Sequence, residues 1–211
     1  MNFIYYIFYT LSKIVAHAFF QYRVIHPERM IESGPLILAA NHQSYFDPPL
    51  AGIASRRAIY FLARKTLLTV PILKKLLPHF LVIPVDRDGT DRTALKHIIA
   101  RLHEGNGVLL FPEGTRSRDG SLQAARSGIG LIIAKTQAPV LPMRIFGAHE
   151  AFPKNAKKIH LHPITVVLGK PIYFTESELT SSHGNHRDLY QHLTNRVMDA
   201  IAQLKLPEAS S

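Results

Sequence analysis

The stretch VLLFPEGTRS, residues 108–117, is the most informative part of this chain, and the other segments are interpreted from it outward. Its apolar run, residues 108–111, is too short for a helix and predicts a buried strand. Pro112 and Gly114 then interrupt the strand pattern and predict a turn. In an open α/β sheet, ligands usually bind where the chain leaves the carboxyl end of a strand. We therefore expect this turn to form part of a ligand site.

The side chains of the turn favour an anionic ligand. Glu113, Thr115, Arg116 and Ser117 supply a carboxylate, a guanidinium and two hydroxyls around Gly114. Arg116 offers a planar fork suited to phosphate, and Glu113 can hold that fork or accept a hydrogen bond from a substrate hydroxyl. A surface turn with an ion pair explains the same residues. The stretch by itself leaves both interpretations open.

Size and composition predict one compact α/β domain. The chain has 211 residues, 46% of them hydrophobic and 19% charged, which is typical of a globular protein with a sizeable core. It contains no cysteine. This excludes a disulfide framework, a thiol nucleophile and a cysteine-ligated metal.

The charge balance predicts polyanionic partners. Lys and Arg number 25 against 15 acidic residues, a net charge of +10. Such a surface attracts nucleic acid, anionic lipid headgroups or a phosphorylated substrate. Most Phe and Tyr residues lie in apolar runs and not among the basic residues, which disfavours binding of single-stranded nucleic acid. We expect no nucleic-acid partner.

The N-terminal segment, residues 1–24, has the composition of a membrane-associating helix. It is almost wholly apolar and aromatic up to Leu11, and after Lys13 the apolar pattern resumes. Its length is marginal for a membrane span, and it lacks the basic start and cleavage site of a signal peptide. Aromatic rings favour the membrane–water boundary, so we expect a helix that docks in that interface. The alternative is a helix packed on the protein's own core.

A second strand end carries a histidine and an aspartate. Residues 35–40 predict a buried strand, which is followed by His42 and, five residues later, Asp47. His42 can accept and return a proton near neutral pH, and a carboxylate on its other ring nitrogen would hold the required tautomer. Because Asp47 precedes Pro48, it also has the position of a helix N-cap. Taken alone, the pair is better explained by a cap and an uninvolved loop histidine, because cap residues are common and most histidines are not catalytic.

Residues 50–77 mix basic and apolar side chains and predict a helical hairpin, with a break at Pro71. It suits contact with an anionic bilayer or the wall of an acyl tunnel, or it is an ordinary amphipathic helix. Residues 80–85 then predict a strand in which Pro84 indicates an edge position or an irregularity. Arg87 follows that strand, and a salt bridge with a neighbouring aspartate is the alternative to a binding role.

The remaining segments continue the alternation of strands and helices. We expect helices at 91–104, from Arg126 through Lys135, and at 189–204, and strands at 139–145 and 164–168. Arg126 lies near the start of its helix, where free amides and a guanidinium would together bind an anion. The pattern predicts an α/β fold with a mixed, mostly parallel central sheet flanked by helices.

These blocks together resemble the glycerolipid acyltransferase family, whose typical members are 1-acylglycerol-3-phosphate acyltransferases. Asn41-His42-x4-Asp47 is similar to its His-x4-Asp block, Arg87 to the basic residue of its second block, residues 111–117 to its third, and residues 140–142 to its fourth. The resemblance covers roughly residues 34–146, with the blocks in the family's order. Two positions depart from the family pattern, since Leu81 stands where glycine is common and Arg126 where lysine is common.

The resemblance implies transfer of a fatty acyl group from acyl-CoA or acyl-carrier protein to the free hydroxyl of a lysophospholipid, most readily 1-acylglycerol-3-phosphate. It implies that His42 is the base, oriented by Asp47, and that no cofactor is needed beyond the donor. The family's substrate-binding positions fall on Arg87, Glu113, Gly114, Thr115, Arg116, Ser117 and Arg126. We expect an acyltransferase domain at 25–207, a tail at 208–211, and association with the cytoplasmic face of an anionic membrane.

Other functions remain compatible with the sequence. The acceptor could be glycerol-3-phosphate or a lysolipid with a different headgroup, because the shared blocks address only the glycerol-phosphate region. A non-catalytic protein that binds anionic lipids would use the same basic residues. His160 and His162, or His183 and His186, could suggest a metal, but no carboxylate cluster lies near them in sequence and we expect no metal site.

Overall fold

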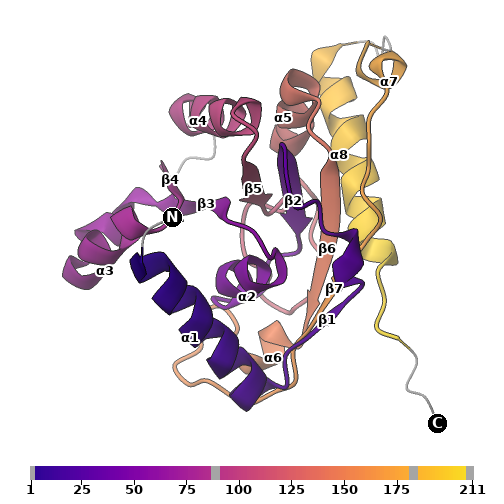
Figure 1. Ribbon diagram of the computed structural model, residues 1–211. Coiled ribbons are helices and arrows are strands. Elements are labelled where there is room, and N and C mark those ends of the chain that lie inside the picture. The colour runs from indigo at the N-terminus through magenta and orange to yellow at the C-terminus, as the bar shows by residue number, and fades with distance from the viewer. Residues whose placement is uncertain (1–2, 87–90, 181–184, 208–211) are drawn as a thin grey trace.

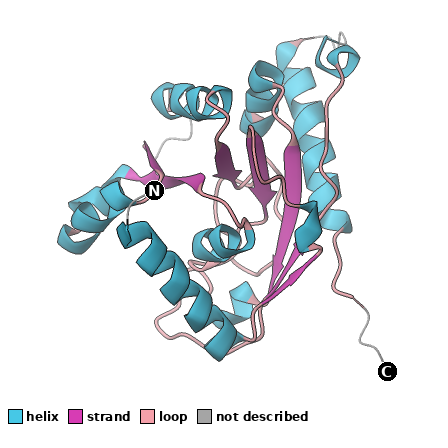
Figure 2. Ribbon diagram, viewed as in Figure 1, coloured by secondary structure: helices cyan, strands magenta, loops and turns pink. Residues whose placement is uncertain are grey.

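The computed structural model describes residues 3–86, 91–180 and 185–207, which form one seven-stranded sheet with helices on both faces (Figures 1 and 2). The strands are β1 (Arg23–Ile25), β2 (Leu36–Ala40), β3 (Ile59–Arg64), β4 (Val82–Val85), β5 (Gly107–Leu110), β6 (Val140–Phe146) and β7 (Thr165–Leu168). The helices are α1 (Phe3–Phe20), α2 (Asp47–Ala54), α3 (Pro71–Leu76), α4 (Arg92–His103), α5 (Gly128–Thr136), α6 (Ala148–Ala151), α7 (Glu176–Thr180) and α8 (His186–Gln203). Short 3-10 turns occupy Pro27–Arg29, Lys65–Thr69 and Leu77–His79.

The sheet confirms the predicted mixed, mostly parallel α/β fold. Its strand order is β1-β7-β6-β2-β5-β3-β4, and every neighbouring pair is parallel except β6 with β7. The central strand β2 pairs with β5 on one side and β6 on the other. Because β2 and β5 are parallel neighbours, their carboxyl ends meet at the same edge of the sheet. The loops that begin at residues 41 and 111 therefore start side by side.

The two faces of β2 enter two separate cores. Leu36 and Leu38 pack into a core formed with α1, α2 and α6, whereas Ile37 and Ala39 face α4, α5 and α8 (Figure 1). All five residues of β2 are buried. A strand covered on both faces has a continuous apolar sequence and no alternation, which explains why residues 35–40 were recognisable as a buried strand.

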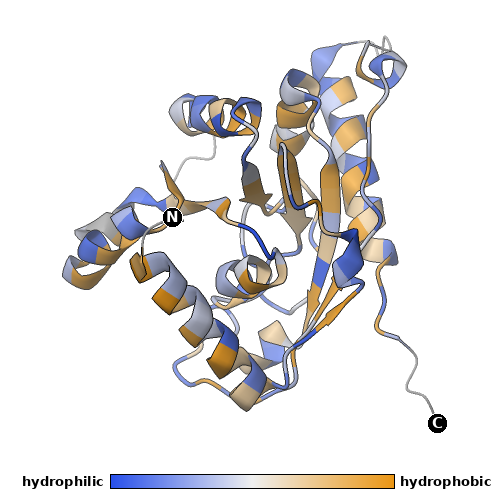
Figure 3. Ribbon diagram, viewed as in Figure 1, coloured by the Kyte–Doolittle hydropathy of each residue, from blue (hydrophilic) through white to orange (hydrophobic). Residues whose placement is uncertain are grey.

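Helix α1 has one packed face and one exposed apolar face. Its packed face contacts α2, since Phe20 meets Phe46 with ring centroids 5.3 Å apart, and Tyr5 and Ala16 are buried. The opposite face leaves Phe3, Ile7, Leu11, Ile14 and Phe19 exposed. Figure 3 shows apolar residues along the whole helix. Within the described chain, α1 alone is long and apolar enough to cross a membrane, and only 17% of it is buried.

The prediction that residues 50–77 are helical was wrong in its middle part. Helix α2 ends at Ala54, Arg56 adopts a left-handed conformation with φ 52°, and residues 59–64 then form strand β3 between β4 and β5. The partners of β3 lie far along the chain, so a local pattern of basic and apolar residues did not reveal them. Pro71 is the first residue of α3. Proline is tolerated in the first turn of a helix although it breaks a helix interior. Strand β4 forms the sheet edge, which confirms the edge position inferred from Pro84.

Close packing of α5 on α8 gives a stability prediction. A Cβ added to Gly130 would lie 1.9 Å from the carbonyl oxygen of Tyr190, a backbone atom of α8, whereas a Cβ on Gly128 would meet nothing within 4 Å. The Gly130 N–H also donates to the Thr194 hydroxyl at 3.1 Å. We expect Gly130→Ala to destabilise the fold by about 2 kcal/mol or more, because the helices must separate. Gly128→Ala, in the same helix, should stay within about 1 kcal/mol of wild type. Thermal unfolding measures both, and equal melting temperatures would contradict this packing.

Candidate active site

The loop after β2 is anchored on both sides of His42. The Asn41 side chain exchanges two hydrogen bonds with the backbone of Ile145 on β6, accepting from its N–H at 2.7 Å and donating to its carbonyl at 3.0 Å. The Gln43 side chain donates to the same carbonyl at 2.8 Å. These amides continue the β2–β6 pairing beyond the end of β2. As a result, His42 leaves the sheet between two immobilised neighbours.

The Asp47 carboxylate closes this loop. Its side chain is fully buried, and Oδ2 accepts three hydrogen bonds: from His42 Nδ1 at 2.8 Å, from the Gln43 N–H at 2.6 Å and from the Ser44 N–H at 2.7 Å. The predicted role of Asp47 as an N-cap was wrong, because α2 begins at Asp47 itself and the carboxylate points back into the loop. Pro48 and Pro49 follow it, and proline has no N–H for a cap to bind.

The contact with Asp47 determines which nitrogen of His42 is available. Because an ionised carboxylate only accepts, Nδ1 must carry the hydrogen, and Nε2 keeps the lone pair that can take up a proton. The Phe111 ring stacks on the imidazole with centroids 3.9 Å apart and planes 14° apart. The His42 side chain is 18% exposed. The structure thus brings together the two residues that the spacing suggested and leaves Nε2 of His42 able to accept a proton.

Glu113 and Ser117 attach the 111–117 turn to His42. Glu113 is 2% exposed, and its two oxygens accept from the His42 N–H at 2.8 Å and the Gln123 N–H at 3.2 Å. The Ser117 N–H donates to the His42 carbonyl at 2.8 Å. Both backbone groups of His42 are therefore held by the neighbouring strand end. Burial raises the pKa of Glu113 to about 7, with the charge of Asp47 adding to the rise and the two amides opposing it.

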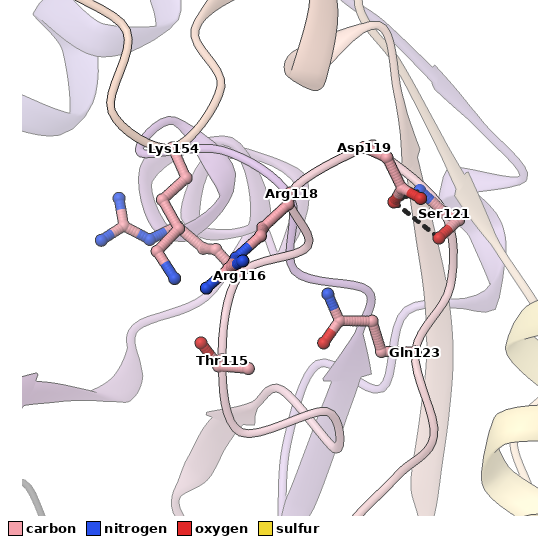
Figure 4. Close-up of a pocket in the computed structure, with 7 residues that line it drawn as sticks. All are labelled: Thr115, Arg116, Arg118, Asp119, Ser121, Gln123 and Lys154. Carbon is pink, nitrogen blue, oxygen red and sulfur yellow. Dashed lines mark hydrogen bonds between the residues drawn. The ribbon is translucent and has the colours of Figure 1, made fainter.

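Arg116 lies at a cavity beside this loop. The cavity has a volume of about 440 Å³, and its lining includes Thr115, Arg116 and Gln123 (Figure 4). The Arg116 guanidinium carbon is 3.6 Å from the centroid of the Tyr45 ring, and its Nη1 is buried with no hydrogen-bond partner in the described part of the chain. The Ser117 hydroxyl is buried and donates to Asp119, another lining residue, at 2.9 Å.

Gly114 and Arg126 meet at the outer side of the turn. Gly114 has φ +68°, a left-handed conformation that suits glycine, and a Cβ there would lie 3.1 Å from Cδ of Arg126. The Arg126 N–H donates to the Pro112 carbonyl at 2.9 Å. Arg126 therefore supports the turn from the start of α5. Arg87, the remaining predicted site residue, lies outside the described residues, as does His183.

Several residues at the site were not singled out from the sequence. Tyr45, Gln123 and Lys154 are among them, together with Arg118, which directly follows the 111–117 block. Arg118 had a local signal, a second arginine two residues after Arg116. Lys154 had no local signal, because only the folding of the chain brings this distant residue to the cavity. In the described ranges, no group of three or more His, Asp or Glu side chains is close enough to hold a metal ion.

A family model and several curated proteins match this chain. The acyltransferase family model matches residues 21–146. A chloroplastic 1-acyl-sn-glycerol-3-phosphate acyltransferase of Brassica napus is 29% identical over 157 residues, covering 72% of this chain and 45% of that protein. A 1-acyl-sn-glycerol-3-phosphate acyltransferase of Borreliella burgdorferi is 29% identical over 163 residues, covering 73% of this chain and 65% of that protein. The chain spans about half the length of the plant relatives it matches.

A solved structure shares the fold. The crystal structure of the 1-acyl-sn-glycerophosphate (LPA) acyltransferase PlsC from Thermotoga maritima superposes with a TM-score of 0.75 at 24% sequence identity. The match covers 98% of this chain and 83% of that one. The described helix α1 and the sheet thus belong to an architecture already known from experiment.

The raised pKa of Glu113 predicts a pH-dependent contribution to stability. Its usual value is 4.5, so between about 4.5 and 7 the folded protein binds this proton more strongly than the unfolded chain does. Stability from this group is therefore greatest at low pH and falls as the pH rises through that window, by up to about 1.4 kcal/mol per pH unit. Glu113→Gln cannot titrate, so the difference in unfolding free energy, wild type minus variant, should fall across the window and then level off.

Chemical denaturation at pH 4.5 to 8 measures that difference. The Glu113→Gln variant also loses one acceptor for a backbone amide, so it carries a constant penalty of about 1 kcal/mol at all pH values. The exposed Glu150→Gln is a matched control for the substitution and should leave stability within about 0.5 kcal/mol of wild type. A difference curve for Glu113→Gln that is flat over the whole range would show that the carboxyl titrates normally.

Proposed function

The chain belongs to the acyltransferase family, and from that membership we propose that it transfers a fatty acyl group from a thioester donor to the free hydroxyl of a lysophospholipid. The observation that carries this proposal is the oriented His42–Asp47 pair beside a cationic cavity. The preferred acceptor is 1-acylglycerol-3-phosphate, with phosphatidic acid as the product. The names of the curated relatives support that choice of substrate, and acyl-CoA or acyl-carrier protein supplies the acyl group.

His42 acts as the general base in the proposed reaction. Its Nε2 takes the proton of the acceptor hydroxyl while that oxygen attacks the thioester carbonyl carbon. The carbonyl oxygen becomes an oxyanion, and its collapse breaks the carbon–sulfur bond and releases a thiolate, which takes the proton back from His42. Asp47 stabilises the imidazolium between these steps, because its buried carboxylate already bonds Nδ1. No covalent acyl-enzyme is needed.

Arg116 is assigned to the phosphate of the acceptor. Its guanidinium carbon lies 3.6 Å from the centroid of the Tyr45 ring, a contact that restrains the fork, and its buried Nη1 has no hydrogen-bond partner among the described residues. Thr115 offers a hydroxyl to the same cavity. Glu113, Gly114, Ser117 and Arg126 shape the turn that presents Arg116. Arg87, which lies outside the described residues, remains a candidate for the same phosphate because of the resemblance of its block to the family.

Helix α1 is proposed to dock the enzyme on an anionic membrane. Its exposed apolar face would enter the boundary between headgroups and acyl chains, where aromatic rings are favoured. The net charge of +10 would add attraction to anionic lipid. An enzyme held on the bilayer in this way meets a lysophospholipid and its acyl chain at the membrane surface.

The base assignment predicts a large loss of activity in His42→Ala. Thiol release from acyl-CoA, with 1-acylglycerol-3-phosphate as acceptor, should fall by at least about a hundredfold, the size of a typical general-base contribution. His97→Ala, an exposed histidine on α4, is the matched control and should retain wild-type turnover. Turnover that survives in His42→Ala would remove this histidine from the chemistry. Wild-type liposome binding without turnover on any donor or acceptor would favour a non-catalytic lipid-binding protein.

The docking assignment predicts that polar substitutions on the exposed face of α1 weaken membrane binding. Leu11→Asp with Ile14→Asp should reduce co-sedimentation with anionic liposomes by about tenfold or more, because two carboxylates would enter the apolar boundary. Leu206→Asp also replaces an exposed leucine and should leave binding unchanged. Circular dichroism confirms that each variant is folded. Equal binding by the α1 variant and the control would contradict the docking role.

A further inference from the structure

The cavity beside Arg116 contains more positive charge than one arginine supplies. Arg116, Arg118 and Lys154 all line it. Figure 4 shows these three side chains on one side of the cavity, with Asp119 and Ser121 across from them. Lys154 lies outside the sequence blocks that identify the family, and the proposed function leaves it without a role. The fold nevertheless brings this third cation to the same place.

The backbone before Lys154 is fastened to the His42 loop. Ser44, which is buried, donates from its hydroxyl to the Phe152 carbonyl at 2.7 Å and forms an isolated antiparallel bridge with Pro153. The rings of Tyr45 and Phe152 also pack, with centroids 5.2 Å apart. The same loop that orients the base therefore determines where Lys154 stands, one residue beyond the bridge.

The Tyr45 ring contacts Arg116 directly and contacts Phe152, two residues before Lys154. One neighbour of that ring is Phe152, and the other is the Arg116 guanidinium at 3.6 Å. The positions of Arg116 and Lys154 are thus coupled through one loop, residues 44–45, and do not depend on two independent surface segments. Lys154 is half-buried, whereas Lys157 and Lys158 further along the chain are exposed.

The cations of this cavity form no ion pair with the described acidic residues. Among the described residues, no carboxylate oxygen lies within 4.0 Å of the charged nitrogens of Arg116, Arg118 or Lys154. Asp119 is the one acidic residue in the lining, and its Oδ1 accepts from the Ser117 and Ser121 hydroxyls and from the Ser121 N–H. The cations at this cavity repel one another. An anionic ligand would attract each of them and offset that repulsion.

The number of cations indicates the charge of the ligand. A phosphate monoester has a second pKa near 6 and carries between about −1.5 and −2 at pH 7, whereas a phosphodiester carries a single negative charge. The single positive charge of Arg116 matches the single negative charge of a diester. The net charge of three cations and one carboxylate matches the charge of a monoester. Lys154 suits the additional charge, because a lysine ammonium acts as a point charge on a flexible stem and needs no fork geometry.

We propose that Lys154 is the residue that makes this cavity select a phosphate monoester over a diester headgroup. The inference rests on the proposed function, whose preferred acceptor is such a monoester, and it adds the residue that distinguishes a terminal phosphate from one esterified to a second alcohol. Arg116 supplies the oriented fork, and Lys154 supplies the charge that only the monoester can use.

The test compares Lys154→Gln with wild type on two acceptors, 1-acylglycerol-3-phosphate and lysophosphatidylcholine. We expect the KM for the monoester to rise about tenfold with kcat within about twofold, and the parameters for the diester to stay unchanged. Lys154→Arg should recover most of the loss, which a purely structural role would not require. Lys157→Gln and Lys158→Gln are matched controls on the same segment, exposed and away from the cavity, and should behave as wild type.

A second arm identifies which substrate brings the phosphate. CoA also carries a monoester, its 3′-phosphate, so the donor is varied between acyl-CoA and acyl-3′-dephospho-CoA. A KM change in Lys154→Gln that is confined to acyl-CoA would place the bound monoester on the donor. Unchanged KM values for both the lysolipid and acyl-CoA would overturn the proposal.

A binding measurement separates failure of this inference from failure of the proposed function. Titration calorimetry with sn-glycerol 3-phosphate should show about tenfold weaker binding by Lys154→Gln than by wild type, whether or not the enzyme turns over. Equal affinities, or no binding by wild type, would remove Lys154 from phosphate recognition. Normal binding with no acyl transfer to any acceptor would instead reject the catalytic assignment while leaving the phosphate site in place.

Discussion

The local architecture of the site depends on one buried oxygen, Oδ2 of Asp47. A carboxylate withdrawn from water must be satisfied by hydrogen bonds, because its burial otherwise costs several kcal/mol. Here all three donors, the His42 imidazole and the N–H groups of Gln43 and Ser44, bind Oδ2, and Oδ1 is buried with no partner among the described residues. The chain can supply them only by wrapping around the carboxylate, so the same contact that folds the loop also orients the imidazole. Pro48 removes a competing donor from the first turn of α2, which keeps the carboxylate directed at the loop.

The parallel sheet explains why two segments separated by about seventy residues act as one unit. Strands β2 and β5 end at the same edge, and Glu113 and Ser117 bind the N–H and the carbonyl of His42 across that edge. On the other side, Asn41 and Gln43 bind Ile145 of β6. His42 is therefore held by both neighbours of the central strand. An imidazole positioned in this way would lose little freedom on binding a substrate, because its geometry is already established.

Predictions from the sequence succeeded where the physical signal was local and failed where it was not. The buried strand at 36–40 was predictable, since a strand covered on both faces consists of apolar residues throughout. Strand β3 was missed because its identity depends on pairing with β4 and β5. The helix start at Asp47 was predicted, but the direction of its carboxylate was not. An N-cap side chain accepts hydrogen bonds from N–H groups that follow it in the chain, whereas the donors to Asp47 precede it.

By itself, the sequence determined the fold class, the family and the chemical groups available: a histidine five residues before an aspartate, and a glycine turn bearing Glu113 and Arg116 after an apolar strand. These features are local, because strand patterns, turns and motif spacings depend on residues that are close together in the sequence. Only the tertiary structure decided that Glu113 binds backbone amides, that Arg116 rests on Tyr45, and that Lys154 reaches the same cavity. These depend on which side chains meet when distant strand ends converge, and such contacts are determined by packing and by the hydrogen-bond needs of buried groups.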